Sequence, residues 1–297
     1  MTRLLILGGG GMLGHKLWQT ALPRFETKAT VRSYEHFFVE RGYPRESVLP
    51  HVDVRDANAL VRAFAAAKPD VVVNCVGLVK QLAASKDALT MIALNSLLPH
   101  QLADLCDIAG ARLIHISTDC VFSGRKGMYL EGDPSDAEDL YGKSKFLGEV
   151  DRLRCLTIRT SIIGRELLTQ NGLVEWFLSN RGKKVDGYER AIFSGLTTNR
   201  LSTLILDLIE EYPELSGIYQ VAAEPIDKYM LLHLLNEAYD ARVEIRCDNS
   251  VVIDRSLDGS RFRAATSFTA PPWPEMIAAM ATNPPPTTNG EASSDSR

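Results

Sequence analysis

Short apolar runs alternate with amphipathic segments through the first half of the chain. The runs predict strands over residues 3–7, 71–73, 112–117 and 155–161, and residues 26–32 are a plausible second strand in chain order. The segments between them place apolar side chains at helical spacing, as over residues 57–67 and 88–109. Uninterrupted apolar strands are typical of a parallel sheet that helices cover on both faces. The pattern therefore predicts an α/β protein with a doubly wound, parallel-sheet Rossmann fold.

The alternation breaks down after about residue 164. Helical stretches and short strands then mix, over residues 173–181, 199–211, 217–221, 227–239 and 243–246. Ligands of open α/β sheets bind outside the carboxyl ends of the strands, so we expect a smaller lobe to cover that edge. We predict an NAD(P)-binding domain over residues 1–163 and a mixed α/β substrate-binding lobe over residues 164–281, partly interleaved with the first. Residues 282–297 carry few apolar side chains and are predicted to be disordered.

Glycines follow the first predicted strand immediately, in the stretch LGGGGMLGHKL. Gly8, Gly11 and Gly14 are spaced as GxxGxxG where the strand turns into a helix. Glycine is needed where a chain turns sharply, approaches a pyrophosphate or packs a helix on a strand. The helix N-terminus offers unpaired N–H groups and a positive dipole end to phosphates. At the start of a βαβ unit, the motif predicts a dinucleotide site.

The end of the second predicted strand indicates which nicotinamide cofactor binds. An acidic residue there bonds the 2′-hydroxyl of the ribose, whereas a basic residue accommodates a 2′-phosphate. The chain has Arg32 at this position and no acid before Glu35, which favours NADP, with NAD as the alternative. Asp53 follows a third short strand and has two interpretations. It either contacts the adenine amino group or caps the helix that starts near Ala57.

Hydroxyl and ammonium groups are expected to converge on the same edge of the sheet. Ser117 and Thr118 end one strand, and Tyr141 and Lys145 follow on a helix predicted beside it. Positions i and i+4 of a helix are neighbours, so the phenol and the ammonium can address one point. Reduction of a ketone needs a hydride donor, a proton donor and a group that polarises the carbonyl.

The requirements of ketone reduction predict a separate role for Tyr141, Lys145 and Thr118. A close ammonium lowers the pKa of a phenol from its ordinary value of about 10, which makes proton exchange feasible near neutrality. We therefore expect Tyr141 to donate the proton and Lys145 to lower its pKa while also holding the nicotinamide ribose. Thr118 is expected to hydrogen-bond the carbonyl oxygen of the substrate.

Composition and charge narrow the classes of function. The formal net charge of −4 and the lack of a basic patch argue against nucleic-acid binding. No stretch approaches the roughly 18 apolar residues of a membrane span, and the N-terminal apolar run is too short for a secretory signal. The five cysteines show no CxxC spacing, which is typical of reduced thiols. We expect a soluble, cytoplasmic protein without a metal site.

Several stretches together resemble the extended short-chain dehydrogenase/reductase superfamily, and in detail the dTDP-4-dehydrorhamnose reductase family. They are GGGGMLG, NCVG at residues 74–77, ALNSLLP around Asn95, STDCVFSG, YGKSKFLGE and LTIRTSIIG. The resemblance extends over about residues 3–280. It implies NADPH-dependent reduction of the 4-keto group of a nucleotide-activated 4-keto-6-deoxy sugar, in deoxysugar or polysaccharide biosynthesis. The implied catalytic residues are Thr118, Tyr141 and Lys145.

The resemblance also implies two sets of binding residues. Those expected on the cofactor side are Gly8, Gly11, Met12, Leu13, Gly14, Arg32, Asp53, Val54, Asn74, Cys75, Val76, Gly77, Asn95, Ser117 and Lys145. Those expected on the substrate side are Thr118, Asp119, Cys120, Tyr141, Ile162 and Thr197. Residues 191–202 look like the segment that closes over the nucleotide-sugar, and Thr198 or Asn199 is expected to cap a helix there. A homodimer is an open alternative to a monomer.

Two departures from the family pattern leave the sugar and its base open. Cys120 stands where the family usually has a tyrosine, and Ile162 where it often has a tryptophan. A UDP-linked 2-acetamido-4-keto sugar therefore competes with dTDP-4-keto-L-rhamnose as substrate. Dehydration is disfavoured, because Asp119 is followed by Cys120 and not by the second acid that a dehydratase needs. A nucleotide-sugar epimerase and a non-catalytic, NADP-binding regulatory subunit remain alternatives.

Overall fold

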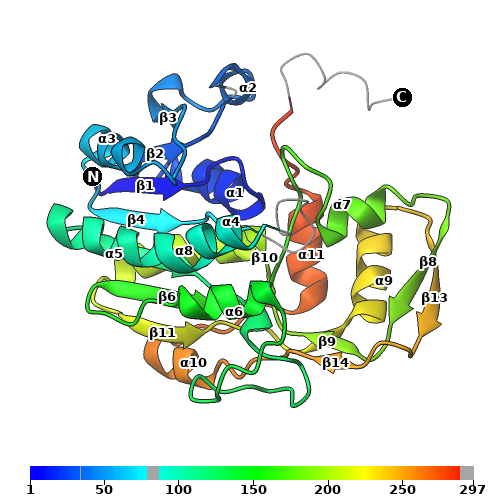
Figure 1. The fold of residues 1–297 in the computed structure, drawn as a ribbon. Helices are drawn as coiled ribbons and strands as arrows, with labels where there is room; N and C mark the ends of the chain where they lie inside the picture. The colour runs from blue at the N-terminus through cyan, green and yellow to red at the C-terminus, as the bar shows by residue number, and fades with distance from the viewer. Residues whose placement is uncertain (34, 79–86, 288–297) are drawn as a thin grey trace.

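A parallel seven-stranded sheet forms the centre of the protein, as the computed structural model shows (Figure 1). Its strands, in spatial order, are β11 (Gly217–Gln220), β6 (Cys155–Arg159), β5 (Arg112–Ile116), β4 (Val71–Asn74), β1 (Arg3–Leu7), β2 (Glu26–Thr30) and β3 (Val48–Leu49). Each neighbouring pair is parallel. The strand order reverses between β1 and β4, which is where doubly wound sheets bind their ligands. The predicted α/β Rossmann fold is confirmed.

The structure describes residues 1–33, 35–78 and 87–287. The helices and short helical turns that accompany the sheet are α1 (Met12–Ala21), α2 (Glu35–Val39), η1 (Arg45–Ser47), α3 (Ala57–Ala67), α4 (Ala88–Ile92), η3 (Ala93–Leu97), α5 (Leu98–Ala109), η4 (Asp119–Val121), α6 (Leu140–Leu147), α8 (Thr198–Glu211) and α10 (Ser260–Thr266). Within these residues, no helix has the length and apolarity needed to cross a lipid bilayer.

Helices cover both faces of the central strands. Leu4 and Ile6 of β1 lie in one apolar cluster with α1 and α8, whereas Leu5 and Leu7 lie in a second cluster with α3 and α5. Because successive side chains of a strand point to opposite faces, both sets are buried at once. This two-sided burial explains why the strand sequences are continuous apolar runs.

A smaller lobe lies beyond the carboxyl ends of the strands, at the right of Figure 1. Its elements are β7 (Ile162–Ile163), α7 (Leu173–Leu178), β8 (Lys184–Tyr188), β9 (Ala191–Phe193), β10 (Leu196–Thr197), β12 (Ile226–Asp227), α9 (Lys228–Ala238), β13 (Glu244–Asp248), β14 (Ile253–Asp254) and α11 (Trp273–Ala281). Three small sheets join them, in the orders β10-β7, β12-β9-β14 and β13-β8.

Two segments after residue 164 return to the main sheet. β11 was expected in the smaller lobe, but it pairs with β6 as the edge strand. α8 packs against α1 on one face of the sheet. The two parts of the chain are therefore interleaved, and the division after residue 163 stays a prediction. The structure describes residues 282–287 of the predicted tail, where the side chain of Asn283 accepts a hydrogen bond from Lys16 at 2.8 Å. Residues 288–297 lie outside the described residues.

The segment predicted as one helix over residues 88–109 is divided into three parts. α4 and α5 are α-helical, whereas η3 between them is a π-helical turn. Turns of this kind occur frequently at functional sites. Asn95 lies in η3, which contacts α6 and the loop after β4.

Candidate active site

α6 begins beside the end of β5 because of two residues around Tyr141. Asp139 is the N-cap of the helix, and its carboxylate accepts a hydrogen bond from the N–H of Gly142 at 2.8 Å. A Cβ at Gly142 would overlap the carbonyl oxygen of Cys120. Only glycine lets the two backbones approach this closely, so the first turn of α6 lies against η4. This contact brings Tyr141 to the hydroxyl of Thr118.

The phenol of Tyr141 is hydrogen-bonded to Thr118. Burial raises the pKa of Tyr141 above its ordinary value, and the nearby Cys120 and Asp119 act in the same direction. The expectation that Lys145 lowers this pKa is therefore wrong for this structure. The physical reason is that desolvation of the phenol dominates, while the ammonium binds elsewhere.

Lys145 lies buried behind Tyr141 on the same helix. Its Nζ donates a hydrogen bond to the carbonyl oxygen of Ile116, the last residue of β5, at 2.7 Å. Burial lowers the pKa of Lys145 to about 8, against the charge of Glu149, which raises it. A Cβ at Gly77 would be 4.0 Å from the Lys145 Nζ. The loop after β4 thus passes directly beside the ammonium.

Thr118 is held by its own neighbours in η4. Its hydroxyl donates to the carboxylate of Asp119 at 3.1 Å and accepts from the N–H of Cys120 at 3.1 Å. Asp119 is buried, and burial raises its pKa, while the charges of Arg255 and Lys228 act in the opposite direction. The residues predicted to polarise and flank a substrate therefore form one connected segment at the end of β5.

Lys228 lies beside these residues, although nothing in the sequence singled it out. It is the first residue of α9, and its ammonium lies 3.9 Å from the centre of the Phe193 ring. Burial lowers the pKa of Lys228, and the charges of Asp119 and Cys120 oppose this effect. Nothing in the stretch PIDKYM distinguishes this lysine from a solvent-exposed one. Its role depends on the fold bringing α9 across from η4.

The glycine loop after β1 fits a dinucleotide. Gly11 is the N-cap of α1 and carries no side chain that could cover the first-turn N–H groups, so a phosphate can approach them. Its own N–H donates to the carbonyl oxygen of Gly8 at 3.0 Å, which closes the turn. A Cβ at Gly14 would overlap that same carbonyl oxygen, so α1 needs glycine there. Met12 and Leu13 form the first turn of the helix between these glycines.

Arg32 and Asp53 lie near each other beyond the ends of β2 and β3. Arg32 is exposed, and its charge contributes to the lowered pKa of Asp53. The main cause of that lowering, to about 2, is a hydrogen bond from Arg55, whose guanidinium pairs with Asp53 at 2.6 Å. Asp53 does not cap α3, because Asp56 is the N-cap and accepts from the N–H of Asn58. The capping interpretation of Asp53 is therefore wrong.

Asn74, Asn95 and Ser117 were expected on the cofactor side, but their side chains bind protein groups. Asn74 contacts the ring of His115 at 3.1 Å and accepts from the N–H of Val76 at 3.1 Å. Asn95 exchanges two hydrogen bonds with the backbone of Leu78 and a third with Ser144 at 3.2 Å. The Ser117 hydroxyl donates to Glu149 at 2.7 Å. These side chains therefore hold the loops around the site in place through hydrogen bonds within the protein.

Three further residues predicted on the cofactor side, Val76, Val54 and Cys75, make apolar contacts in the structure. Val76 packs against Gly8, and Val54 packs on the apolar cluster beneath α3. Burial raises the pKa of the Cys75 thiol to about 12, so this group stays protonated. These three residues line the floor of the loops through apolar contacts.

Two predicted substrate residues lie in the short pair β7 and β10. Ile162 is partly exposed and pairs with Leu196. Thr197 is fully buried and is the N-cap of α8, accepting from the N–H of Arg200 at 3.4 Å. The cap is therefore Thr197, and the expectation of Thr198 or Asn199 was wrong. A capping role accounts for Thr197 without a substrate contact.

Comparison with known proteins identifies the family. Residues 1–225 match the family described as RmlD substrate binding domain. The spore coat polysaccharide biosynthesis protein SpsK of Bacillus subtilis is 28% identical over 229 residues, which are 75% of this chain and 74% of that protein. A dTDP-4-dehydrorhamnose reductase of Streptomyces griseus is 34% identical over 148 residues, which are 50% of this chain and 43% of that enzyme. The match to the reductase thus covers less than half of its length.

Solved structures share the fold over nearly the whole chain. The dTDP-4-dehydrorhamnose reductase of Bacillus anthracis in complex with NADP has a TM-score of 0.76 at 19% identity, covering 94% of this chain and 99% of that one. The Bordetella bronchiseptica enzyme WbmG in complex with NAD and UDP has a TM-score of 0.74 at 21% identity, covering 94% of each chain. At these identities the likeness establishes the fold alone. The match over residues 1–225 shows that the chain belongs to the RmlD substrate binding domain family, which confirms the family resemblance predicted from its motifs.

Proposed function

We propose that the protein is an NADPH-dependent reductase of the 4-keto group of a nucleotide-activated 4-keto-6-deoxy sugar. The observation that carries this proposal is the connected set of Thr118, Tyr141 and Lys145 at the carboxyl end of β5. The set lies one strand from the point where the strand order reverses. Reductases of dTDP-4-dehydrorhamnose among the relatives support the same reaction class.

Each group of this set has a distinct part in the reaction. NADPH, when bound, supplies the hydride. Tyr141 holds its proton at neutral pH because burial raises its pKa, so it can donate that proton to the oxygen as the carbonyl is reduced. Thr118 can donate a second hydrogen bond to the same oxygen once its hydroxyl turns away from Asp119, to which it donates in this structure. Lys145 keeps a positive charge behind the phenol and lies where it can hold the ribose of the cofactor.

The residues around the glycine loop support a dinucleotide as cofactor. The uncovered first turn of α1 receives the pyrophosphate, and Arg32 at the end of β2 provides a cation for a 2′-phosphate. NADP is bound by the structurally similar reductase of Bacillus anthracis, and NAD by WbmG. We propose NADPH as the preferred donor and NADH as a weaker one. All five cysteines are free thiols, which favours the cytoplasm as the place of action.

The sugar and the base are the open part of the proposal. Cys120 and Ile162 replace the larger aromatic residues that are usual in the family, which leaves more room beside η4 and β7. A dTDP-linked 4-keto-6-deoxy sugar and a UDP-linked 2-acetamido-4-keto sugar are the two substrates to compare. Lys228 and Phe193 lie on the lobe side of η4 and are expected to contact the sugar.

A panel assay tests this proposal. The protein is incubated with NADPH and, in turn, with dTDP- and UDP-linked 4-keto-6-deoxy sugars, and loss of the reduced-nicotinamide absorbance is followed. We expect turnover with at least one sugar and a product reduced at C4. Binding of NADPH without turnover on any sugar would instead favour the regulatory-subunit alternative. Exchange of the C4 configuration without net consumption of cofactor would favour an epimerase.

A further inference from the structure

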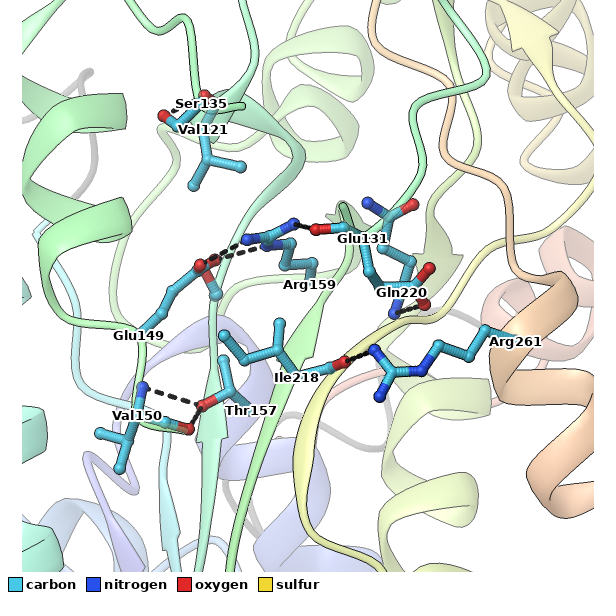
Figure 2. A network of polar contacts seen from close by, with 11 residues as sticks. Val121, Glu131, Ser135, Glu149, Val150, Thr157, Arg159, Ile218, Gln220 and Arg261 are labelled. Atoms are coloured by element: carbon cyan, nitrogen blue, oxygen red, sulfur yellow. Dashed lines mark hydrogen bonds and ion pairs between the residues drawn. The ribbon is translucent and has the colours of Figure 1, made fainter. Parts of the chain in front are cut away.

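A buried ion pair lies directly beneath the site. The Arg159 guanidinium binds the Glu149 carboxylate in bidentate fashion, with its Nε 2.8 Å from Oε1 and its Nη2 2.7 Å from Oε2 (Figure 2). The side chains are 5% and 3% exposed, respectively. Removing two charges from water carries a large energetic cost, which close geometry and further hydrogen bonds must offset. The proposed reaction uses neither residue.

Further hydrogen bonds tie this pair to the surrounding elements. Glu149 accepts a third bond, at 2.7 Å, from the hydroxyl of Ser117 at the end of β5. Arg159, at the end of β6, donates to the backbone carbonyl oxygen of Glu131 at 3.2 Å. The Glu131 side chain accepts from the backbone N–H of Gln220 in β11 at 3.0 Å. The pair thus connects the ends of three neighbouring strands with the loop that leads to α6. Figure 2 shows Arg159 between Glu149 and Glu131, with Glu131 bound to Gln220.

The same pair is adjacent to the two groups that the proposed reaction needs in place. Glu149 follows Lys145 by four residues, just beyond the end of α6, and its charge acts on the Lys145 ammonium. Lys145 donates to Ile116, and Glu149 accepts from Ser117, which are consecutive residues. Thr118 comes next in the chain. Lys145 of α6 and Glu149 just after it therefore bind two consecutive residues at the end of β5. These contacts come immediately before Thr118, whose hydroxyl faces Tyr141.

We propose that Glu149 and Arg159 form a positioning pair that fixes the end of β5 against α6 and so sets the places of the Lys145 ammonium and the Thr118 hydroxyl. This inference rests on the proposed reductase function. Neither residue reaches the substrate in this arrangement, and both act through the groups that they hold. Precise placement matters because a displacement of about 1 Å in a reacting group costs about 100-fold in rate.

The choice of variants follows from the energetics of buried charge. Removing one partner leaves an unpaired buried charge and destabilises the fold strongly. Replacing both partners by apolar residues of similar volume is often neutral or stabilising. The test variant is therefore the double substitution Glu149→Leu with Arg159→Met. The matched control is Arg112→Met, which removes a buried guanidinium from the opposite end of β5, where it binds the carbonyl oxygens of Leu208 and Leu215.

We expect the double variant to fold with a single thermal transition and to lose kcat by at least about tenfold. Its KM for the sugar should stay within about threefold, because the substrate contacts are untouched. The control should lose thermal stability but keep its kcat. Arg159→Lys, which keeps the charge with fewer hydrogen bonds, should give a smaller loss of kcat and provides the same test if the double variant does not fold. A folded double variant with a kcat within about threefold of the wild type overturns the inference.

A crystal structure of the double variant separates this inference from the proposed function. We expect the contact between Lys145 and the carbonyl oxygen of Ile116 to be lost or lengthened, with Thr118 displaced from Tyr141. Retention of both contacts overturns the inference, whatever the turnover. If the wild-type protein reduces no sugar of the panel, the proposed function fails, and this structure still decides whether the pair positions Lys145 and Thr118.

Discussion

The protonation states of Tyr141 and Lys145 are the chemical basis of the site. Burial raises the pKa of the phenol and lowers that of the ammonium, so the two values move apart from their nearly equal ordinary ones. At neutral pH both groups hold their protons. Reduction of a ketone consumes a proton at the new hydroxyl, so a protonated phenol beside a cation is the state that the reaction requires.

The pKa of Lys145 leads to a pH dependence. A lysine whose pKa is lowered to about 8 is charged below that pH and neutral above it. We expect kcat/KM to fall as pH rises through about 8, because the positive charge behind Tyr141 is lost. Lys145→Arg should remove this alkaline decline, since a guanidinium stays charged, although its altered shape should lower the rate at all pH values. Rates of the two proteins from pH 6 to 10 would check this, and a flat wild-type profile would contradict it.

Arg32 is the residue that we expect to decide between the two nicotinamide cofactors. Arg32 is exposed at the end of β2, where the 2′-phosphate of NADPH would lie. We expect Arg32→Ala to weaken NADPH binding about tenfold or more and to leave NADH binding within about twofold. Fluorescence titration of both nucleotides measures this. Arg62→Ala on the exposed side of α3 is the control and should change neither affinity. Equal losses for both nucleotides would refute the assignment of Arg32 to the 2′-phosphate.

At the scale of elements, the position of α6 decides whether the site forms. The helix lies between η4, which carries Thr118 as its N-cap, and η3, which carries Asn95. Its close approach to η4 depends on a residue without a side chain at position 142. The contact between two backbones, and not the helical pattern itself, brings Tyr141 to Thr118.

Substitution at Gly142 tests this contact. The new methyl group of Gly142→Ala would overlap the carbonyl oxygen of Cys120, so α6 must shift. We expect the free energy of unfolding to fall by about 1–3 kcal/mol, the range for overpacking, and kcat to fall at least about tenfold. Gly132→Ala is the matched control, because no atom lies within 4 Å of its new methyl group. Urea denaturation and steady-state rates give both quantities; unchanged values for Gly142→Ala would exclude a role of this close approach.

The elements could be predicted where the apolar pattern was unambiguous. The strands with continuous apolar runs lie within two residues of their predicted bounds, because burial on both faces leaves no other choice of side chain. The π-helical form of η3 was not predictable, since its periodicity resembles that of an α-helix. The placement of β11 was also missed, because a four-residue strand of partly exposed residues reveals nothing about its partner. The N-caps observed at Asp56 and Thr197 lie a few residues from the expected caps, because the local sequence does not show which of several polar residues caps the helix.

At the scale of the whole molecule, the sheet and the smaller lobe together produce the site. The sheet and α6 bring the glycine loop, Thr118 and Tyr141 to one edge, and α9 of the lobe brings Lys228 near Asp119 of η4. The first set was predictable, because strand ends and helical spacing fix it in the sequence. Lys228, Glu149 and Arg159 were not, since the burial of a charged side chain depends on long-range packing that no local pattern records.

In the proposed reaction, Tyr141 protonates the oxygen that NADPH-dependent reduction creates. The variant Tyr141→Phe replaces the hydroxyl by hydrogen, and its NADPH consumption is measured with the best sugar of the panel. Tyr219→Phe, on the edge strand β11, is the control. We expect turnover of Tyr141→Phe to fall by at least about 100-fold, as for loss of a general acid, with NADPH affinity and the control rate unchanged. A rate for Tyr141→Phe close to that of the wild type would show that Tyr141 is not the proton donor.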